Sequence, residues 1–188
     1  MTLNSVTTEV RASYAFVERN FNLVKRYWGW EAVWIMYGIA NALAVTYIGA
    51  GMGALTGQAV DTQFLVMYLL IGTVVWRYLS IVFDSLSEMI MWERWEGTIE
   101  YTFMAPVSRL THMVGQTIFS VVYGLMQAGL ILLAVALFFH IDLSHANFYG
   151  ATAVLMAGSL SFIGVGIIAA VLPMLYPERG AQMTNFAQ

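Results

Sequence analysis

The charged side chains of this sequence concentrate in one short segment, "MWERWEGTIEYTFMAPVSRL", residues 91–110. They are Glu93, Arg94, Glu96, Glu100 and Arg109. No arrangement of serine, histidine and acid stands out for nucleophilic catalysis, and the chain has no cysteine. We therefore predict no catalytic residue, and we expect this segment to be a contact surface for a partner.

A second set of charges interrupts an apolar run. Arg77, Asp84 and Glu88 are spaced by seven and four residues, which places them along one helical face. Charges at membrane depth are costly and usually face protein or water. One interpretation makes this face part of a substrate path or a gate. The other pairs Arg77 with Asp84, which with Glu88 lies near the cytoplasmic headgroups.

Metal and nucleotide sites have little support. His140, Asp142 and His145 form the sequence "HIDLSH", but such a loop more often contacts only water, so we predict no metal site. A phosphate-binding G-x-x-x-x-G-K-[ST] loop needs its lysine, and the single lysine, Lys25, follows a valine. By that motif the chain binds no nucleotide, and we predict no cofactor in it.

The composition requires that the elements positioning these residues lie in lipid. Of 188 residues, 60% are hydrophobic and 10% are charged, and the mean hydropathy is +0.71. A soluble domain has about a quarter of its residues charged. So few charges cannot cover a soluble surface. The net charge of −3 arises from few groups and gives no indication of nucleic-acid binding.

Long gaps between charged residues predict the membrane crossings. A helix of about 20 mostly apolar residues crosses a bilayer. Backbone groups in lipid must bond internally, so the prediction is an all-α integral membrane protein. We place four spanning helices at residues 30–50, 63–86, 111–139 and 148–175, and we expect the second to run past the lipid through Glu88 and Trp92.

The arginines and the lysine indicate the orientation. They precede the first span, lie between the second and third, or follow the fourth, apart from Arg77. Loops 51–62 and 140–147 contain neither residue type. Positive residues remain on the cytoplasmic side, so we predict that both visible termini and residues 91–110 are cytoplasmic.

Residues 1–29 are predicted to contain an amphipathic helix. Its apolar face consists of Val10, Tyr14, Val17, Phe21, Val24 and Trp28. Thr7 or Thr8 is expected to cap its start, with Glu9 in the first turn. Such a helix can lie in the headgroup layer with its apolar side down. The alternative is a helix that packs on a partner.

Residues 91–110 are predicted to form a short helix between two breaks. Gly97 permits a sharp redirection. Thr98 is expected to cap a helix over 98–105, which Pro106 ends because the residue before a proline is disfavoured in the α region. Ser108 is expected to cap the third crossing.

The sequence "ERWEGTIEYTFMAPVSR" resembles the pattern E-x-x-x-G-T-x-E-x-x-x-x-x-P-x-S-R of membrane subunits of type-2 ATP-binding-cassette exporters. The matching positions are Glu93, Gly97, Thr98, Glu100, Pro106, Ser108 and Arg109. The resemblance implies an amphipathic elbow helix, six spanning helices, and a coupling helix that docks into a separate P-loop ATPase subunit. ATP and Mg would then be bound by that partner subunit.

The resemblance also implies a second permease half, identical or different, in the cell (plasma) membrane. The cargo would be hydrophobic or amphipathic: a drug, a lipid or a lipid-linked glycan. We hypothesise that Glu96 and Glu100 present negative charge to the ATPase, while Phe103 and Met104 make apolar contact. A channel or carrier without an ATPase is the alternative. Since four crossings are visible and six are implied, we expect a chain truncated where "GAQMTNFAQ" enters a fifth span.

Overall fold

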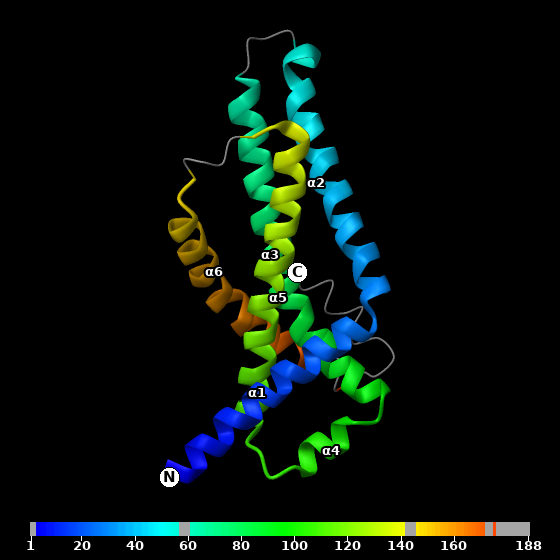
Figure 1. Ribbon diagram of the computed structural model, residues 1–188, viewed down its shortest axis with the longest axis vertical. Coiled ribbons are helices and arrows are strands. Elements are labelled where there is room, and N and C mark those ends of the chain that lie inside the picture. The colour runs from blue at the N-terminus through cyan, green and yellow to red at the C-terminus, as the bar shows by residue number, and fades with distance from the viewer. Residues whose placement is uncertain (1–2, 57–60, 142–145, 172–174, 176–188) are drawn as a thin grey trace. The chain divides into compact units, whose positions relative to one another are not determined.

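The structure is a computed structural model that describes residues 3–56, 61–141, 146–171 and 175. These residues form helices and no strand (Figure 1). In chain order the helices are α1 (Leu3–Arg26), α2 (Trp28–Thr56), α3 (Thr62–Trp95), α4 (Ile99–Met104), α5 (Arg109–Phe139) and α6 (Phe148–Ala169). The predicted all-α fold is confirmed for this part of the chain.

Four of the helices, α2, α3, α5 and α6, are long and apolar enough to cross a membrane. Large apolar side chains are exposed along them, for example Leu137 at 68% and Ile168 at 73%. An exposed apolar surface of this extent suits lipid rather than water. The four predicted crossings are thus found as helices, and the last residues of the predicted span 148–175 lie partly outside the described residues.

Helix α3 is longer than one bilayer crossing. Its 34 residues correspond to a length of about 51 Å, whereas the hydrocarbon core is about 30 Å thick. A helix of this length can extend beyond the apolar layer, and the position of its Glu93 end outside that layer stays a prediction.

The start of α1 differs from the prediction. The helix begins at Leu3, so Thr7 and Thr8 lie inside it and do not cap it, and no acid stands in its first turn. Glu9 instead accepts a hydrogen bond from the hydroxyl of Thr111 on α5. Glu9 thus contacts another helix, α5, in place of the expected interaction with the first turn of its own helix.

The chain divides into two compact units. Unit 1 consists of residues 1–26, 79–124 and 156–188, and unit 2 of residues 27–78 and 125–155. In unit 1, α6 approaches α3 closely at Gly166, where a Cβ atom would lie 3.4 Å from the carbonyl oxygen of Phe83. In unit 2, Gly38 of α2 lies against Ile131 of α5 in the same way.

Candidate functional site

Helix α3 ends in a hydrogen-bonded motif that explains the sequence Glu93–Gly97–Thr98. Gly97 adopts a φ of +68°, a backbone conformation that residues other than glycine rarely adopt. The N–H of Thr98 donates to the carbonyl of Glu93 (2.9 Å), and the N–H of Gly97 donates to the carbonyl of Arg94 (3.2 Å). This pair of bonds is the Schellman arrangement, which satisfies carbonyls at the end of a helix.

Thr98 has a different role from the one predicted. It stands at the N-cap position of α4, but its side chain makes no capping hydrogen bond. Its hydroxyl instead donates back to the Glu93 carbonyl at 3.2 Å. The reason is its backbone, which has helical angles (φ −88°, ψ −12°) rather than the extended angles of a side-chain cap.

Helix α4 is a short, exposed element between two breaks. None of its residues is buried, and Tyr101 and Met104 are each 72% exposed. It ends where predicted, since Ala105 before Pro106 has extended backbone angles (φ −63°, ψ 143°). Glu100 lies in its first turn, where the helix dipole favours an acid.

The start of α5 fixes the other side of this segment. Ser108 caps α5 as predicted, because its hydroxyl accepts the N–H of Thr111 at 3.1 Å. The guanidinium carbon of Arg109 lies 5.0 Å from the centre of the Phe103 ring, within the range of a cation–π contact. Side-chain contacts therefore hold α4 near the first turn of α5.

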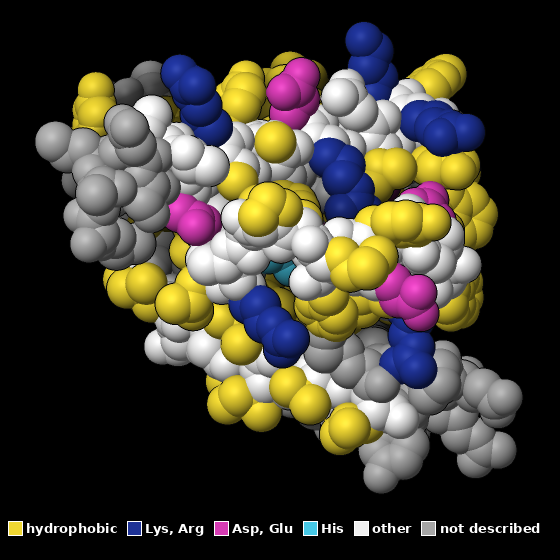
Figure 2. Space-filling view, turned by 90° about the horizontal axis from the view of Figure 1, so that it is seen from below, with side chains coloured by type: hydrophobic (Ala, Val, Ile, Leu, Met, Phe, Trp, Pro, Cys, Tyr) yellow, Lys and Arg dark blue, Asp and Glu magenta, His cyan; other side chains and the backbone are white. Residues whose placement is uncertain are grey.

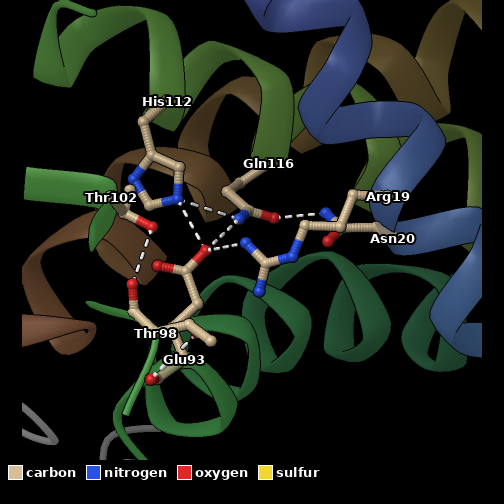
Figure 3. Close-up of polar contacts among 7 residues, drawn as sticks. All are labelled: Arg19, Asn20, Glu93, Thr98, Thr102, His112 and Gln116. Carbon is tan, nitrogen blue, oxygen red and sulfur yellow. Dashed lines mark hydrogen bonds and ion pairs between the residues drawn. The ribbon is translucent and has the colours of Figure 1, made fainter. Parts of the chain in front are cut away.

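Beneath α4 the carboxylate of Glu93 is the centre of a buried polar cluster (Figure 3). One of its oxygens, Oε1, lies 2.5 Å from Nη1 of Arg19 and 3.0 Å from Nε2 of His112. The side-chain amide of Gln116 donates to the same oxygen at 3.4 Å, and Asn20 donates to the amide oxygen of Gln116. Residues of α1, α3 and α5 thus meet at one carboxylate.

Helix α1 packs on α5 along the face that contains these residues. The Ser13 hydroxyl donates to the carbonyl of Thr111, and the Phe16 ring lies 4.7 Å from the imidazole of His112. Gly115 makes this approach possible, since a Cβ atom there would lie 2.9 Å from the carbonyl oxygen of Ser13. A side of α1 that contains the polar residues Ser13 and Asn20 therefore faces the protein.

The predicted apolar face of α1 is divided between two environments. Val17, Phe21 and Val24 pack against a buried cluster of Ile81, Phe119 and Tyr123. Val10 and Tyr14 remain exposed, at 63% and 68%. The exposed pair suits the predicted headgroup contact, whereas Val17, Phe21 and Val24 contribute to the core of unit 1. Trp28, the last residue of the predicted face, begins α2 and is 70% exposed.

Two small cavities lie between α4 and the first turn of α5. A cavity of about 190 Å³ is lined mainly by apolar side chains together with Glu93, His112 and Arg109. A second, of about 70 Å³, is lined by Phe16, Thr102, Phe103, Val107, Ser108, Arg109 and His112. Figure 2 shows a histidine at the floor of a hollow in the surface. Thus α4 is not packed tightly on the helices beneath it.

The structure distributes the predicted contact residues between surface and interior. Glu93 is fully buried and cannot touch a partner directly. Thr98 is partly buried. The remaining predicted residues are at least partly exposed: Glu96, Gly97, Glu100, Phe103, Met104, Pro106, Ser108 and Arg109.

The predicted charged face of α3 falls in both units. Arg77, in unit 2, and Asp84, in unit 1, are both half-buried, and Glu88 is exposed. Their proposed pairing stays a prediction. Among the described residues no group of three or more histidines and acids is placed to hold a metal; Asp142 and His145 lie outside those residues.

Sequence reasoning missed Arg19, Asn20, His112 and Gln116 as site residues. A pattern on α5 could have revealed two of them. His112, Gln116 and Ser120 recur every four residues in a mostly apolar helix, so they share one face. All three are buried, and the Ser85 hydroxyl of α3 donates to that of Ser120 at 2.5 Å. Polar side chains at this spacing in a membrane helix indicate a protein contact.

No protein-family model, no curated protein and no solved structure matches this chain. Support for a function therefore comes from the geometry of the site.

Proposed function

We propose that this chain is the transmembrane subunit of an ATP-driven exporter of the type-2 ATP-binding-cassette class, and that α4 is its coupling helix. The observation that supports the proposal is the short helix itself. It stands between Gly97 and Pro106, joins two membrane-length helices, and has no buried residue. Most of its side chains are exposed and are available to a partner.

The chemistry of α4 indicates what the partner must offer. Phe103 and Met104 are 44% and 72% exposed, and Glu96 and Glu100 are exposed acids beside them. Apolar anchors within a polar rim are typical of protein interfaces. A groove with an apolar floor and basic residues at its edge would be complementary. ATP and Mg would be bound by that ATPase subunit, since this chain lacks the phosphate-binding lysine motif.

The contacts beneath α4 supply a route for coupling. A displacement of α4 acts on the Glu93 carbonyl through Thr98, and on α5 through Arg109 and Phe103. The Glu93 carboxylate passes the displacement to Arg19 of α1. ATP-driven closure of the partner would thereby tilt α3 and α5 in each of two permease halves and alternate the opening of the path between them.

The proposal includes an orientation and a cargo class. Both visible termini and α4 face the cytoplasm, as the distribution of arginines predicts. The cargo is hydrophobic or amphipathic, in keeping with the exposed apolar surface of the spanning helices. The location is the cell membrane.

Affinity purification in mild detergent from the native host tests the proposal. A P-loop ATPase should co-purify in equal amounts with the native chain, and it should be lost from the Glu96→Lys/Glu100→Lys double variant. Reversing both charges would place two lysines against a basic rim. Glu18→Lys, on the side of α1 away from α5, is the control and should retain the partner.

Either of two results would contradict this function. If no ATPase co-purifies with a folded native chain, the channel or carrier hypothesis replaces it. If the double variant retains the ATPase, with transport and ATPase activity unchanged, α4 is not the coupling helix.

A further inference from the structure

Arg77 is the one described charged side chain of unit 2 that lies away from a helix end. Glu31 stands in the first turn of α2, and Asp61 immediately precedes α3. Within the predicted span 63–86, Arg77 is about 14 Å along the helix from the nearer end. An arginine side chain is shorter than this distance, so its guanidinium cannot reach the headgroups by extending along the helix.

Within the described part of the chain, the surroundings of Arg77 leave one donor of its guanidinium, the Nε–H, unsatisfied. Its Nε is buried and has no hydrogen-bond partner among the described residues. That nitrogen lies near Gly38 of α2, where a Cβ atom would stand 3.8 Å from it. A buried donor without a partner costs about 1–3 kcal/mol, and more for a charged group. The Nε–H donor is therefore open to an acceptor from outside the described chain.

The side chain remains accessible to such an acceptor. Arg77 is half-buried as a residue, although its Nε is enclosed. A guanidinium presents its donors in a planar fork that matches carboxylate and phosphate oxygens. No side chain of α2 separates its backbone from this fork at position 38, because that residue is glycine.

We propose that Arg77 binds the anionic group, a phosphate or a carboxylate, of an amphipathic molecule within the membrane. This inference rests on the proposed exporter function and narrows its cargo to amphiphiles with an acidic group. A resident lipid is a poorer candidate, because its headgroup stays at the bilayer surface. Asp84 and Glu88 already have contacts of their own within the chain.

The test measures thermal unfolding of the purified full chain in a neutral detergent, with dodecyl phosphate as the probe. A ligand that binds the folded state raises the unfolding midpoint in proportion to its occupancy. Dodecyl phosphate should stabilise the native chain, and dodecyltrimethylammonium at equal concentration should not. Arg77→Gln should need at least about tenfold more dodecyl phosphate for the same shift, because a charge-assisted contact is lost.

Matched variants separate this site from general attraction to a basic side chain. Arg77→Lys keeps the charge but not the fork and should bind with intermediate strength. Arg94→Gln makes the same chemical change near the end of α3 and should leave dodecyl phosphate binding within about twofold of the native chain. An equal loss in Arg94→Gln would overturn the proposal.

A structural role for Arg77 predicts a different result without the probe. If the arginine formed an ion pair in the native protein, Arg77→Gln would lower the unfolding midpoint markedly. The proposal expects an unchanged or raised midpoint, since a buried donor without a partner among the described residues is removed. A lowered midpoint, or equal stabilisation of the native chain by both amphiphiles, refutes it. These measurements need no ATPase. A negative result here would therefore contradict the anion site without contradicting the exporter function, which the co-purification experiment tests.

Discussion

Glu93 joins α3 to three other helices, through its backbone carbonyl and through its side-chain carboxylate. Its carbonyl accepts the N–H and the hydroxyl of Thr98, which joins α3 to the start of α4. Its carboxylate accepts from Arg19 and contacts His112, which joins α3 to α1 and α5. The contacts with Arg19 and His112 need the carboxylate of a glutamate, whereas any residue could supply the carbonyl that Thr98 contacts.

A double-mutant cycle measures how strongly Glu93 and Arg19 depend on each other. Glu93→Gln leaves the guanidinium of Arg19 without its counter-ion, and Arg19→Gln leaves the buried carboxylate without its strongest donor. We expect each single variant to lower the free energy of unfolding by about 1–3 kcal/mol, and the double variant by less than the sum.

Denaturant titration in detergent micelles would give these free energies. An additive double variant would contradict the contact, because independent residues add. Arg11→Gln, on the exposed side of α1, is the control and should change the stability by less than about 0.5 kcal/mol.

At the residue scale, local chemistry is predictable from the sequence and long-range pairing is not. The roles of Gly97, Pro106 and Ser108 follow from neighbours a few residues away, and the structure agrees with each. Arg19 and Glu93 are 74 residues apart, so nothing in the local pattern of either identifies the other. The capping prediction for Thr98 is wrong because its hydroxyl had two acceptable partners, and the geometry of the turn selected the Glu93 carbonyl.

At the element scale, α1 has three sides rather than two. One side packs on α5, one is apolar and exposed at Val10 and Tyr14, and the third contains Arg11 and Glu18. The sequence predicts the helix and its apolar face but not the docking side, because that side is polar. Polar side chains on an amphipathic helix are normally assigned to water.

The close approach of α1 to α5 can be tested at a single glycine. In Gly115→Ala the new Cβ would lie 2.8 Å from Cβ of Phe16 and 2.9 Å from the carbonyl oxygen of Ser13, so α1 must move away. We expect faster amide hydrogen exchange throughout α1, together with a loss of about 1–3 kcal/mol of stability.

Gly129→Ala is a matched control on the same helix. Nothing lies within 4 Å of the Cβ position there, so exchange in α1 should be unchanged. If Gly115→Ala also leaves α1 exchange unchanged, the packing of α1 on α5 is not as described.

At the scale of the whole molecule, apolar runs predict the four long helices because length and composition alone decide whether a helix can span a bilayer. Sidedness depends on the distribution of a few arginines instead. The chain has no cysteine, so single cysteines can report sidedness directly.

Cysteines placed at two exposed positions should label from opposite sides. Asp61→Cys should react with a membrane-impermeant maleimide in intact cells, whereas Glu100→Cys should react only after permeabilisation. Both native residues are exposed, so burial does not limit the reaction. The reverse pattern would place α4 outside the cell and remove it from any cytoplasmic ATPase.

The docking of α1 also sets a schedule for biosynthesis. Its contacts with α3 and α5 join residues 74 to 102 positions apart, so α1 leaves the ribosome long before its partners exist. At roughly 5–20 residues per second, the delay is on the order of 4 to 20 seconds. During that interval Arg19 and Asn20 have no protein partner, and the nascent helix must be kept at the membrane surface until α5 has been inserted.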